Sequence, residues 1–433
     1  MLKKLFYKIF FNQSVKFLYS SLGKKRKLHF VLLIGLFIIQ SFAEILSIGS
    51  ILPFVTAISR PDVLFNEIQK YDFLKDNKYF QTELQVIIIS FIIFLSLIIL
   101  SASIRLISMY ANFRISLMAG YELSLKIFNN IINQDIDFFY KNDSSQLISF
   151  ITTKTNYCAS CLMHYFGILN NCILILIVFI SLLILSPIFT ILVFLFFSST
   201  YLFIMLVFRS KVKKNSYNIA TAENELIKLL REAVENIKII IIHKLQNYHL
   251  KIFSVVKLKK DKGAISNLSI SSIPKIFMET VAIVLLSSIA FFLIVNSENN
   301  FLEILPYFAI IALSGQKLLP IFQQLYFSYQ GLLSESESVK EVTEFLIKKN
   351  NLSETNIINH KKIKFNHQIS FNNVSFDYQN DKFSINNINI DFKKNQKIGI
   401  VGPSGSGKST FIDLLMGLII PKSGHIKIDG KIL

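Results

Sequence analysis

Long runs of apolar residues alternate with polar connections over most of the chain. A helix that crosses a bilayer needs about 20 apolar residues, at a rise of about 1.5 Å per residue. The run from Phe166 to Phe208 is far longer than that and contains Ser186-Pro187 at its centre. Because a residue before proline is pushed out of helical geometry, this run divides into two helices. The pattern therefore predicts six spans, at 30–55, 86–107, 166–185, 188–208, 276–295 and 301–322.

Charge in the connections predicts which side each one occupies. Residues 1–27 hold eight Lys or Arg and no Asp or Glu, and residues 209–275 hold fourteen basic against five acidic residues. The positive-inside rule places both segments in the cytoplasm. The mixed loop at 59–84 and the turn at 297–303, which has no basic residue, are expected outside. Residues 1–27 are interpreted as an amphipathic elbow segment lying on the membrane surface before an uncleaved first span.

The two long inside connections show helical spacing, as at Leu226, Leu229, Leu230 and Ala233. Long helices running out of the membrane on both sides of a short break would form intracellular hairpins. Such hairpins would be contact points for a cytoplasmic domain. Ordinary amphipathic connectors explain the same periodicity, so both interpretations stay open.

Overall composition supports a membrane protein. The chain of 433 residues is 52% hydrophobic and 17% charged, whereas soluble domains average about 25% charged residues. Its net charge of +18 is carried by basic residues that cluster beside apolar runs. That distribution fits the positive-inside rule and anionic lipid, and it argues against nucleic acid as a partner.

Three ionisable residues fall inside the predicted spans: Glu44, Arg105 and Lys317. A charge in hydrocarbon costs at least about 2.5 kcal/mol, so such residues usually face a bundle interior or water. Glu44 and Lys317 are predicted to line a cavity. Arg105, near the inner end of its span, either lines the same cavity or extends its side chain to the inner interface.

Two cysteines, Cys158 and Cys161, have the CxxC spacing. No second pair and no histidine cluster accompanies them in the sequence, so a tetrahedral metal site is not completed. They are interpreted as incidental thiols, in preference to a metal or redox site.

Composition changes after the sixth span. Residues 336–365 are polar and are predicted to link the membrane region, 28–335, to a second domain at 366–433. "ISFNNVSFDY", "FSINNINIDF" and "QKIGIVG" are typical of strands separated by turn residues. Seven of the fifteen glycines fall between Gly399 and Gly430, which indicates a different fold with specific backbone requirements.

Residues Gly402 to Ser409 satisfy the GxxxxGK[ST] pattern of a phosphate-binding P-loop. Lys397–Val401 predicts a strand entering the loop, and an amphipathic helix leaves it, with apolar residues at Phe411, Leu414, Leu415 and Leu418. Glycines let backbone N–H groups converge on phosphate, and the helix N-terminus adds partial positive charge. Lys408 is expected to reach the β- and γ-phosphates of ATP, and Ser409 the Mg²⁺ ion. The predicted ATP-binding residues of the loop are Gly402, Pro403, Ser404, Gly405, Ser406, Gly407, Lys408, Ser409 and Thr410.

Six spans followed by "FNNVSFDY" and "VGPSGSGKSTFIDLLMGLIIPKSGHIKIDG" resemble an ATP-binding-cassette (ABC) exporter half-transporter. The resemblance implies an all-α six-helix transmembrane domain with long cytoplasmic helical extensions, followed by an incomplete α/β P-loop NTPase domain. Asp137 to Ser149 resembles the first coupling segment of these exporters, and Arg231 to Ile241 the second. Tyr378 falls where the family stacks an aromatic ring on adenine, although a strand-end core residue is the alternative. A second half-transporter, as a homodimer, is the implied partner.

The family's glutamine loop, signature sequence, Walker B aspartate with its catalytic glutamate, and switch histidine do not occur up to Leu433. His425 is not at a switch position and is predicted to be a solvent-facing strand residue. Since hydrolysis needs a positioned water and a complete Mg²⁺ shell, this chain alone is expected not to hydrolyse ATP. The nucleotide domain is expected to be C-terminally truncated and partly open, with an unprotected sheet edge and little for the helix at 411–418 to pack on.

The leading hypothesis is ATP-driven export or lipid flipping across the cytoplasmic (inner) membrane, with the N-terminus and nucleotide domain in the cytoplasm. Similarity to lipid-linked oligosaccharide flippases suggests a lipid-like or amphipathic substrate in contact with membrane lipid. The alternatives are a membrane subunit that binds nucleotide without turnover and a remnant without function.

Overall fold

The structure, a computed structural model, describes residues 18–432 apart from 19, 60, 63–64, 67–81, 186, 297–300, 351–364 and 378–383. The chain divides into two compact units. Unit 1 comprises residues 1–127 and 148–346, and unit 2 comprises residues 128–147 and 347–433. Most of the surface segment predicted at 1–27 lies outside the described residues.

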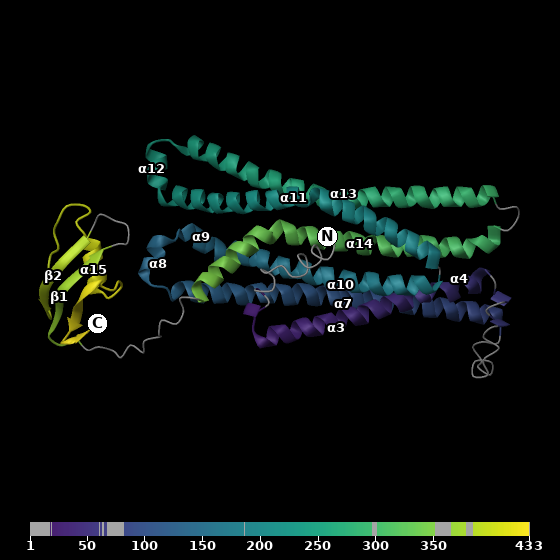
Figure 1. Cartoon of the computed structure of the whole chain (residues 1–433), viewed down its shortest axis with the longest axis horizontal. Coiled ribbons are helices and arrows are strands. Elements are labelled where there is room, and N and C mark those ends of the chain that lie inside the picture. Colours follow the sequence, from purple (N-terminus) through teal and green to yellow (C-terminus); the bar gives the residue numbers. More distant parts are fainter. Residues whose placement is uncertain are drawn as a thin grey trace. The chain divides into compact units, whose positions relative to one another are not determined.

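The described part of unit 1 is built from helices (Figure 1). In chain order its elements are α3 (Lys24–Gly49), α4 (Ile51–Ser59), α7 (Glu83–Ile132), α9 (Ser144–Ser149), the π-helical turn η2 (Phe150–Lys154), α10 (Thr155–Leu185), α11 (Pro187–Glu235), α12 (Ile237–Ile242), α13 (Gln246–Asn296) and α14 (Phe301–Asn350). The last residues of α7, the first residues of α9 and the last residues of α14 belong to unit 2.

Four stretches of the described residues are long and apolar enough to cross a membrane: Lys24–Ile58, Glu83–Ile132, Ser144–Ile184 and Val193–Glu235. They overlap the first four predicted spans. The apolar window of Glu83–Ile132 is only 6% buried inside the protein. Since exposing such a surface to water is unfavourable, this helix faces lipid or another chain. The fifth and sixth predicted spans fall on α13 and α14, where many side chains are not described, and they stay predictions.

Helix boundaries explain the long apolar run and its extensions. Helix α10 ends at Leu185 and α11 begins at Pro187, in agreement with the division predicted at Ser186-Pro187. Proline suits the first position of a helix because its missing N–H would be unpaired there. Helix α11 has 49 residues and α13 has 51. At about 1.5 Å per residue each is about 75 Å long, more than twice the hydrocarbon thickness, so both project well beyond any bilayer.

The linker predicted at 336–365 begins too early. Helix α14 continues to Asn350, and Val339, Val342 and Leu346 on it are buried. These three residues recur at helical spacing, so one face of the polar segment packs against the rest of unit 1. The sequence predicts a linker here because the segment is rich in polar and charged residues. A narrow apolar stripe is sufficient to keep it helical.

Unit 2 contains a four-stranded antiparallel sheet in the order β2-β1-β3-β4. Its elements are α8 (Ile136–Lys141), β1 (Gln368–Asp377), β2 (Ser384–Lys393), α15 (Lys408–Leu415), β3 (Ser423–Ile428) and β4 (Lys431–Ile432). The predicted strands at "ISFNNVSFDY" and "FSINNINIDF" correspond to β1 and β2. His425 lies on β3 and is exposed, as predicted.

The packing of unit 2 corrects two expectations. Residues 397–401 are not a strand, and Val401 is 93% exposed. The reason is that a central parallel strand needs paired neighbours, and none of the described strands pairs with this segment. Helix α15, by contrast, is well packed: Leu414 is 0% exposed and lies in a core with Phe371, Val374 and Ile426. The antiparallel strands thus supply an apolar surface against which α15 packs, contrary to the expectation that this helix would have little to pack on.

We expect Leu414→Ala to destabilise unit 2 by about 2–5 kcal/mol, because it leaves a cavity in a fully buried site. Thermal unfolding and limited proteolysis of the purified chain measure this change. The matched control is Leu418→Ala, a residue of the same type that is 43% exposed, with an expected cost below about 1 kcal/mol. Equal effects of the two substitutions would mean that α15 is not anchored through Leu414.

Candidate functional site

The predicted P-loop forms a closed turn at the start of α15. Gly405 and Gly407 have φ angles of 81° and 89°, a left-handed region that glycine enters without strain. Gly407 is the N-cap of α15, and its carbonyl accepts a 2.8 Å hydrogen bond from the Phe411 N–H. A Cβ atom at Gly402 would meet the Ser406 Oγ at 2.7 Å. Gly405 and Gly407 are therefore needed for the loop to close, and Gly402 lets the Ser406 side chain approach the backbone.

Lys408 lies across this loop. Its Nζ donates hydrogen bonds to the carbonyl oxygens of Gly402, at 2.9 Å, and Pro403, at 2.7 Å. The ammonium group is thereby held over the turn, where the first backbone N–H groups of α15 lack helical partners. An ammonium beside a helix N-terminus is a favourable environment for phosphate oxygens. The donors present in the loop fit the phosphates of a nucleotide.

The two hydroxyl residues after Lys408 differ in exposure. Ser409 is exposed, so its hydroxyl is free to approach a ligand, and an oxygen donor of this kind suits Mg²⁺. Thr410 is buried, so its hydroxyl is less accessible to a ligand than that of Ser409. Tyr378, the predicted adenine-stacking residue, lies outside the described residues.

The first predicted coupling segment belongs to the same unit as the P-loop. Ile136, at the start of α8, packs against the core that contains Leu414. The Tyr140 hydroxyl donates a 3.1 Å hydrogen bond to Asp413 Oδ2 on α15. Helix α8 is therefore attached to the helix that carries the P-loop. Sequence reasoning suggested a contact point here but missed Asp413, because a pairing across 273 positions leaves no local signal.

The three charged residues of the predicted spans have different surroundings. Glu44 on α3 is buried, and its Oε2 accepts a 2.5 Å hydrogen bond from the Ser101 hydroxyl on α7. This burial agrees with a position in the bundle interior. Arg105 is exposed on α7, and the side chain of Lys317 lies outside the described residues.

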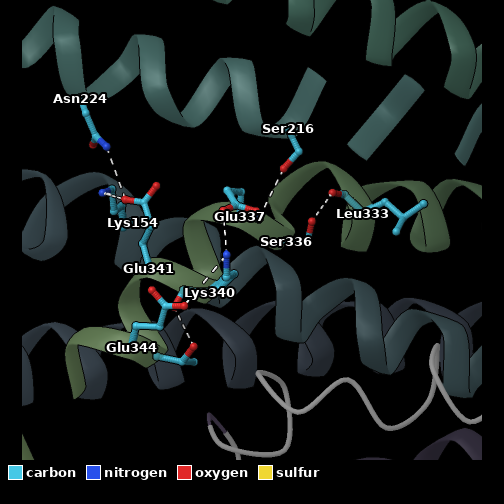
Figure 2. A network of polar contacts seen from close by, with 10 residues as sticks. Lys154, Ser216, Asn224, Leu333, Ser336, Glu337, Lys340, Glu341 and Glu344 are labelled. Atoms are coloured by element: carbon cyan, nitrogen blue, oxygen red, sulfur yellow. Dashed lines mark hydrogen bonds and ion pairs between the residues drawn. The ribbon is translucent and has the colours of Figure 1, made fainter. Parts of the chain in front are cut away.

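A buried ion pair, which sequence reasoning missed, joins three helical segments of unit 1 (Figure 2). Lys154, at the end of η2, is 1% exposed and pairs with Glu341 on α14. Asn224 on α11 donates a 3.4 Å hydrogen bond to the same Glu341 Oε2 atom. The Lys154 ammonium also lies 4.4 Å from the centre of the Phe150 ring. These contacts compensate the cost of burying the lysine.

Cys158 and Cys161 are both buried on α10 as free thiols. Within the described ranges, no three residues of the types His, Cys, Asp and Glu form a group that would hold a metal ion.

Comparisons with known proteins match both parts of the chain. The profile of the ABC transporter transmembrane region matches residues 30–321, and that of the ABC transporter domain matches residues 385–433. The fold is similar to that of a bacterial Atm1-family ABC exporter with ATP bound, with a TM-score of 0.63 at 14% identity. That similarity covers 95% of this chain and 69% of the exporter chain.

Several curated proteins are similar in sequence over shorter stretches. ABC transporter B family member 18 of Arabidopsis thaliana is 29% identical over 52% of this chain and 18% of its own length. The leukotoxin export ATP-binding protein LtxB of Aggregatibacter actinomycetemcomitans is 36% identical over 27% of this chain and 16% of its own. The alpha-hemolysin translocation ATP-binding protein HlyB of Proteus vulgaris is 47% identical over 16% of this chain and 10% of its own. The chain spans less than a fifth of the length of each of these relatives.

We expect Ile136→Asp to release α8 from unit 2, because it sets a charge against an apolar core. Hydrogen–deuterium exchange over residues 136–141 should accelerate by at least tenfold. Tyr140→Phe removes a single exposed hydrogen bond, worth about 1 kcal/mol, so the acceleration should be about fivefold. Phe139→Asp, at a residue that is 43% exposed, is the control and should leave the exchange unchanged. Equal exchange in all three variants would show that α8 is not attached through these side chains.

We expect Lys154→Ala to lower the stability of unit 1 by about 3–5 kcal/mol, since it leaves Glu341 without its partner. Lys340→Ala breaks a 3.3 Å pair with Glu337 in which the lysine is 55% exposed, and should cost less than about 1 kcal/mol. Thermal unfolding in detergent compares the two variants. The double substitution Lys154→Met with Glu341→Gln should recover most of the loss. A Lys154→Ala variant as stable as Lys340→Ala would contradict a structural role for the pair.

Proposed function

The chain belongs to the ABC transporter family, and we propose that it drives export across a membrane by binding ATP. It is a multi-pass membrane protein of the half-transporter type, with a transmembrane region fused to a nucleotide-binding region. The single observation that carries the proposal is the closed P-loop on α15, with Lys408 held across it and α8 attached to the same helix. That arrangement joins phosphate binding to the segment that connects the two parts of the chain.

In this proposal ATP binds with its phosphates in the loop from Gly402 to Thr410. The backbone N–H groups at the start of α15 and the Lys408 ammonium neutralise the phosphate charge, and the Ser409 hydroxyl contributes to the Mg²⁺ shell. When bound, ATP with Mg²⁺ would supply the free energy of nucleotide binding at this site. Lys408 exchanges its two carbonyl partners, Gly402 and Pro403, for phosphate oxygens. Tyr378 stacks on the adenine, as the family resemblance implies.

Movement of α15 reaches the membrane region through α8. Asp413 and the P-loop lie on one short helix, so a displacement of that helix carries Tyr140 and Ile136 with it. The second coupling segment, at α12, exposes Ile239, Ile241 and Ile242. We assign this apolar surface to the nucleotide domain of a second copy of the chain, which makes the working transporter a homodimer.

The proposed orientation puts the N-terminus and unit 2 in the cytoplasm, with the spans in the cytoplasmic membrane. It is supported by the eight basic residues in 1–27 and the fourteen in 209–275. For the substrate we propose a lipid-like or amphipathic molecule with a polar head group. Buried Glu44, together with Arg105 and Lys317, would meet that head group, and the apolar part would follow the Phe- and Ile-rich helix faces.

We expect Lys408→Ala to weaken ATP binding by at least tenfold, because the loop loses its only side-chain cation. Equilibrium binding of a fluorescent ATP analogue to the purified chain measures the effect. Lys394→Ala, an exposed lysine in the turn after β2, is the matched control and should leave affinity within twofold. Unchanged binding in the Lys408 variant would remove the P-loop from the proposal.

A further inference from the structure

Helices α11 and α13 of unit 1 lie side by side and are joined through α12 (Figure 1). An open cavity lies between the two helices. Its volume is about 430 Å³, large enough for a head group of small-molecule size. The lining residues are Asn215, Asn218, Val255, Leu258, Lys259, Lys262 and Gly263. Two lysines and two asparagines therefore lie beside the apolar side chains of Val255 and Leu258.

The charges around the cavity are not balanced. Lys257 and Lys260 of α13 point to other partners: Lys257 pairs with Asp261 at 2.9 Å, and Lys260 pairs with Glu223 at 2.6 Å. Lys259 and Lys262 line the cavity, and neither forms an ion pair with another described residue. Two cations on one wall with no carboxylate among the lining residues favour an anion in the cavity.

The amide and apolar side chains that line the cavity restrict the class of anion that would fit. Asn215 Nδ2 donates a 2.9 Å hydrogen bond to Asn267 Oδ1, which holds this side chain in place. An amide nitrogen carries two N–H donors, so Asn215 and Asn218 both retain donors for a ligand oxygen. Val255 and Leu258 are more than half exposed beside the lysines. A ligand with a phosphate group next to an apolar portion matches both halves of the cavity.

A glycine allows the two helices to approach this closely. A Cβ atom at Gly263 would lie 2.9 Å from Ile219 Cγ1 on α11. The two helices therefore pack closely at Gly263, which also lines the cavity. A ligand bound in the cavity would contact α11 and α13 at once, so we expect it to stabilise the packing of these two helices.

The predicted topology places the cavity on the cytoplasmic side of the membrane. Asn215 lies seven residues beyond the predicted end of the fourth span at Phe208, and Lys262 lies fourteen residues before the predicted start of the fifth span at Ile276. At about 1.5 Å per residue these separations are about 10 Å and about 21 Å, so the cavity extends from just beyond the head-group layer further into the cytoplasm. Lys211, Lys213 and Lys214 occupy the intervening turns of α11. Such a basic segment attracts anionic head groups, at about 1 kcal/mol per lysine.

We propose that this cavity is a binding site for the phosphate group of an anionic ligand, with Lys259 and Lys262 as its cationic contacts. The site is distinct from the P-loop and does not depend on nucleotide binding. The phosphate belongs either to an acidic phospholipid of the inner leaflet or to a soluble phosphate ester. Val255 and Leu258 contact the apolar part of the ligand.

The chain has no tryptophan, so one introduced residue reports on the site alone. Leu258→Trp places the reporter in the cavity wall, and Leu268→Trp places a control reporter on α13 outside it. The full chain in neutral detergent is titrated with dihexanoyl phosphatidylglycerol, with dihexanoyl phosphatidylcholine, and with glycerol 3-phosphate. We expect a saturable fluorescence change with phosphatidylglycerol at position 258 and none at position 268.

Charge removal then tests the two lysines. In the Leu258→Trp background, Lys259→Gln with Lys262→Gln should weaken phosphatidylglycerol binding by at least tenfold. Lys251→Gln with Lys257→Gln removes the same charge from α13 outside the cavity and should stay within twofold. Lys259→Arg with Lys262→Arg should retain binding, and thermal unfolding checks that every variant is folded.

The titrations separate the two sources of phosphate. A response to phosphatidylglycerol alone supports a lipid head group, and an equal response to glycerol 3-phosphate supports a soluble ester. Equal responses to phosphatidylglycerol and phosphatidylcholine, or equal losses in the two glutamine variants, overturn the proposal.

Discussion

The burial of Leu414 is the contact on which the nucleotide-binding part of the structure depends. Helix α15 has only eight residues, too few to be stable by itself in water. Leu414 fixes it against β1 and β3 through an apolar core. With the helix held there, its N-terminus presents unpaired N–H groups to the glycine-rich loop, and its outer face presents Asp413 to Tyr140. One buried side chain thus positions the phosphate site and the attachment of α8.

In unit 1 the corresponding constraint is the cost of burying charge. Lys154 is almost inaccessible to solvent, and a lysine in such a place is stable only beside a hydrogen-bonded carboxylate. Glu341 and Asn224 meet that requirement from α14 and α11. The buried carboxylate of Glu44, nearer the start of the chain, likewise has a hydrogen-bond partner, the Ser101 hydroxyl. The apolar faces, by contrast, remain largely exposed, as suits surfaces that face lipid or a second chain.

The sequence predicts a structural feature correctly where interactions between residues close together in the chain determine that feature. The break at Ser186-Pro187 follows from the ring of proline, and the loop from Gly402 to Lys408 follows from backbone angles that glycine alone adopts easily. The sequence-based predictions were wrong where contacts with residues distant in the chain determine the structure. The apolar stretch 397–401 has the composition of a strand but no described strand to pair with, and the polar stretch after 335 remains helical because Val339, Val342 and Leu346 are buried.

By itself the sequence determined the apolar windows, the long amphipathic helices that continue them, and the phosphate-binding loop. Each of these depends on residues close together in the chain, through hydrogen bonds within a helix or the φ angles of a few glycines. Only the tertiary structure decided the partner of Lys154, the attachment of Tyr140 to Asp413, and the convergence of Lys259 and Lys262 with Asn215 and Asn218. Those contacts join residues far apart in the chain, where spacing and composition carry no record of which side chains will meet.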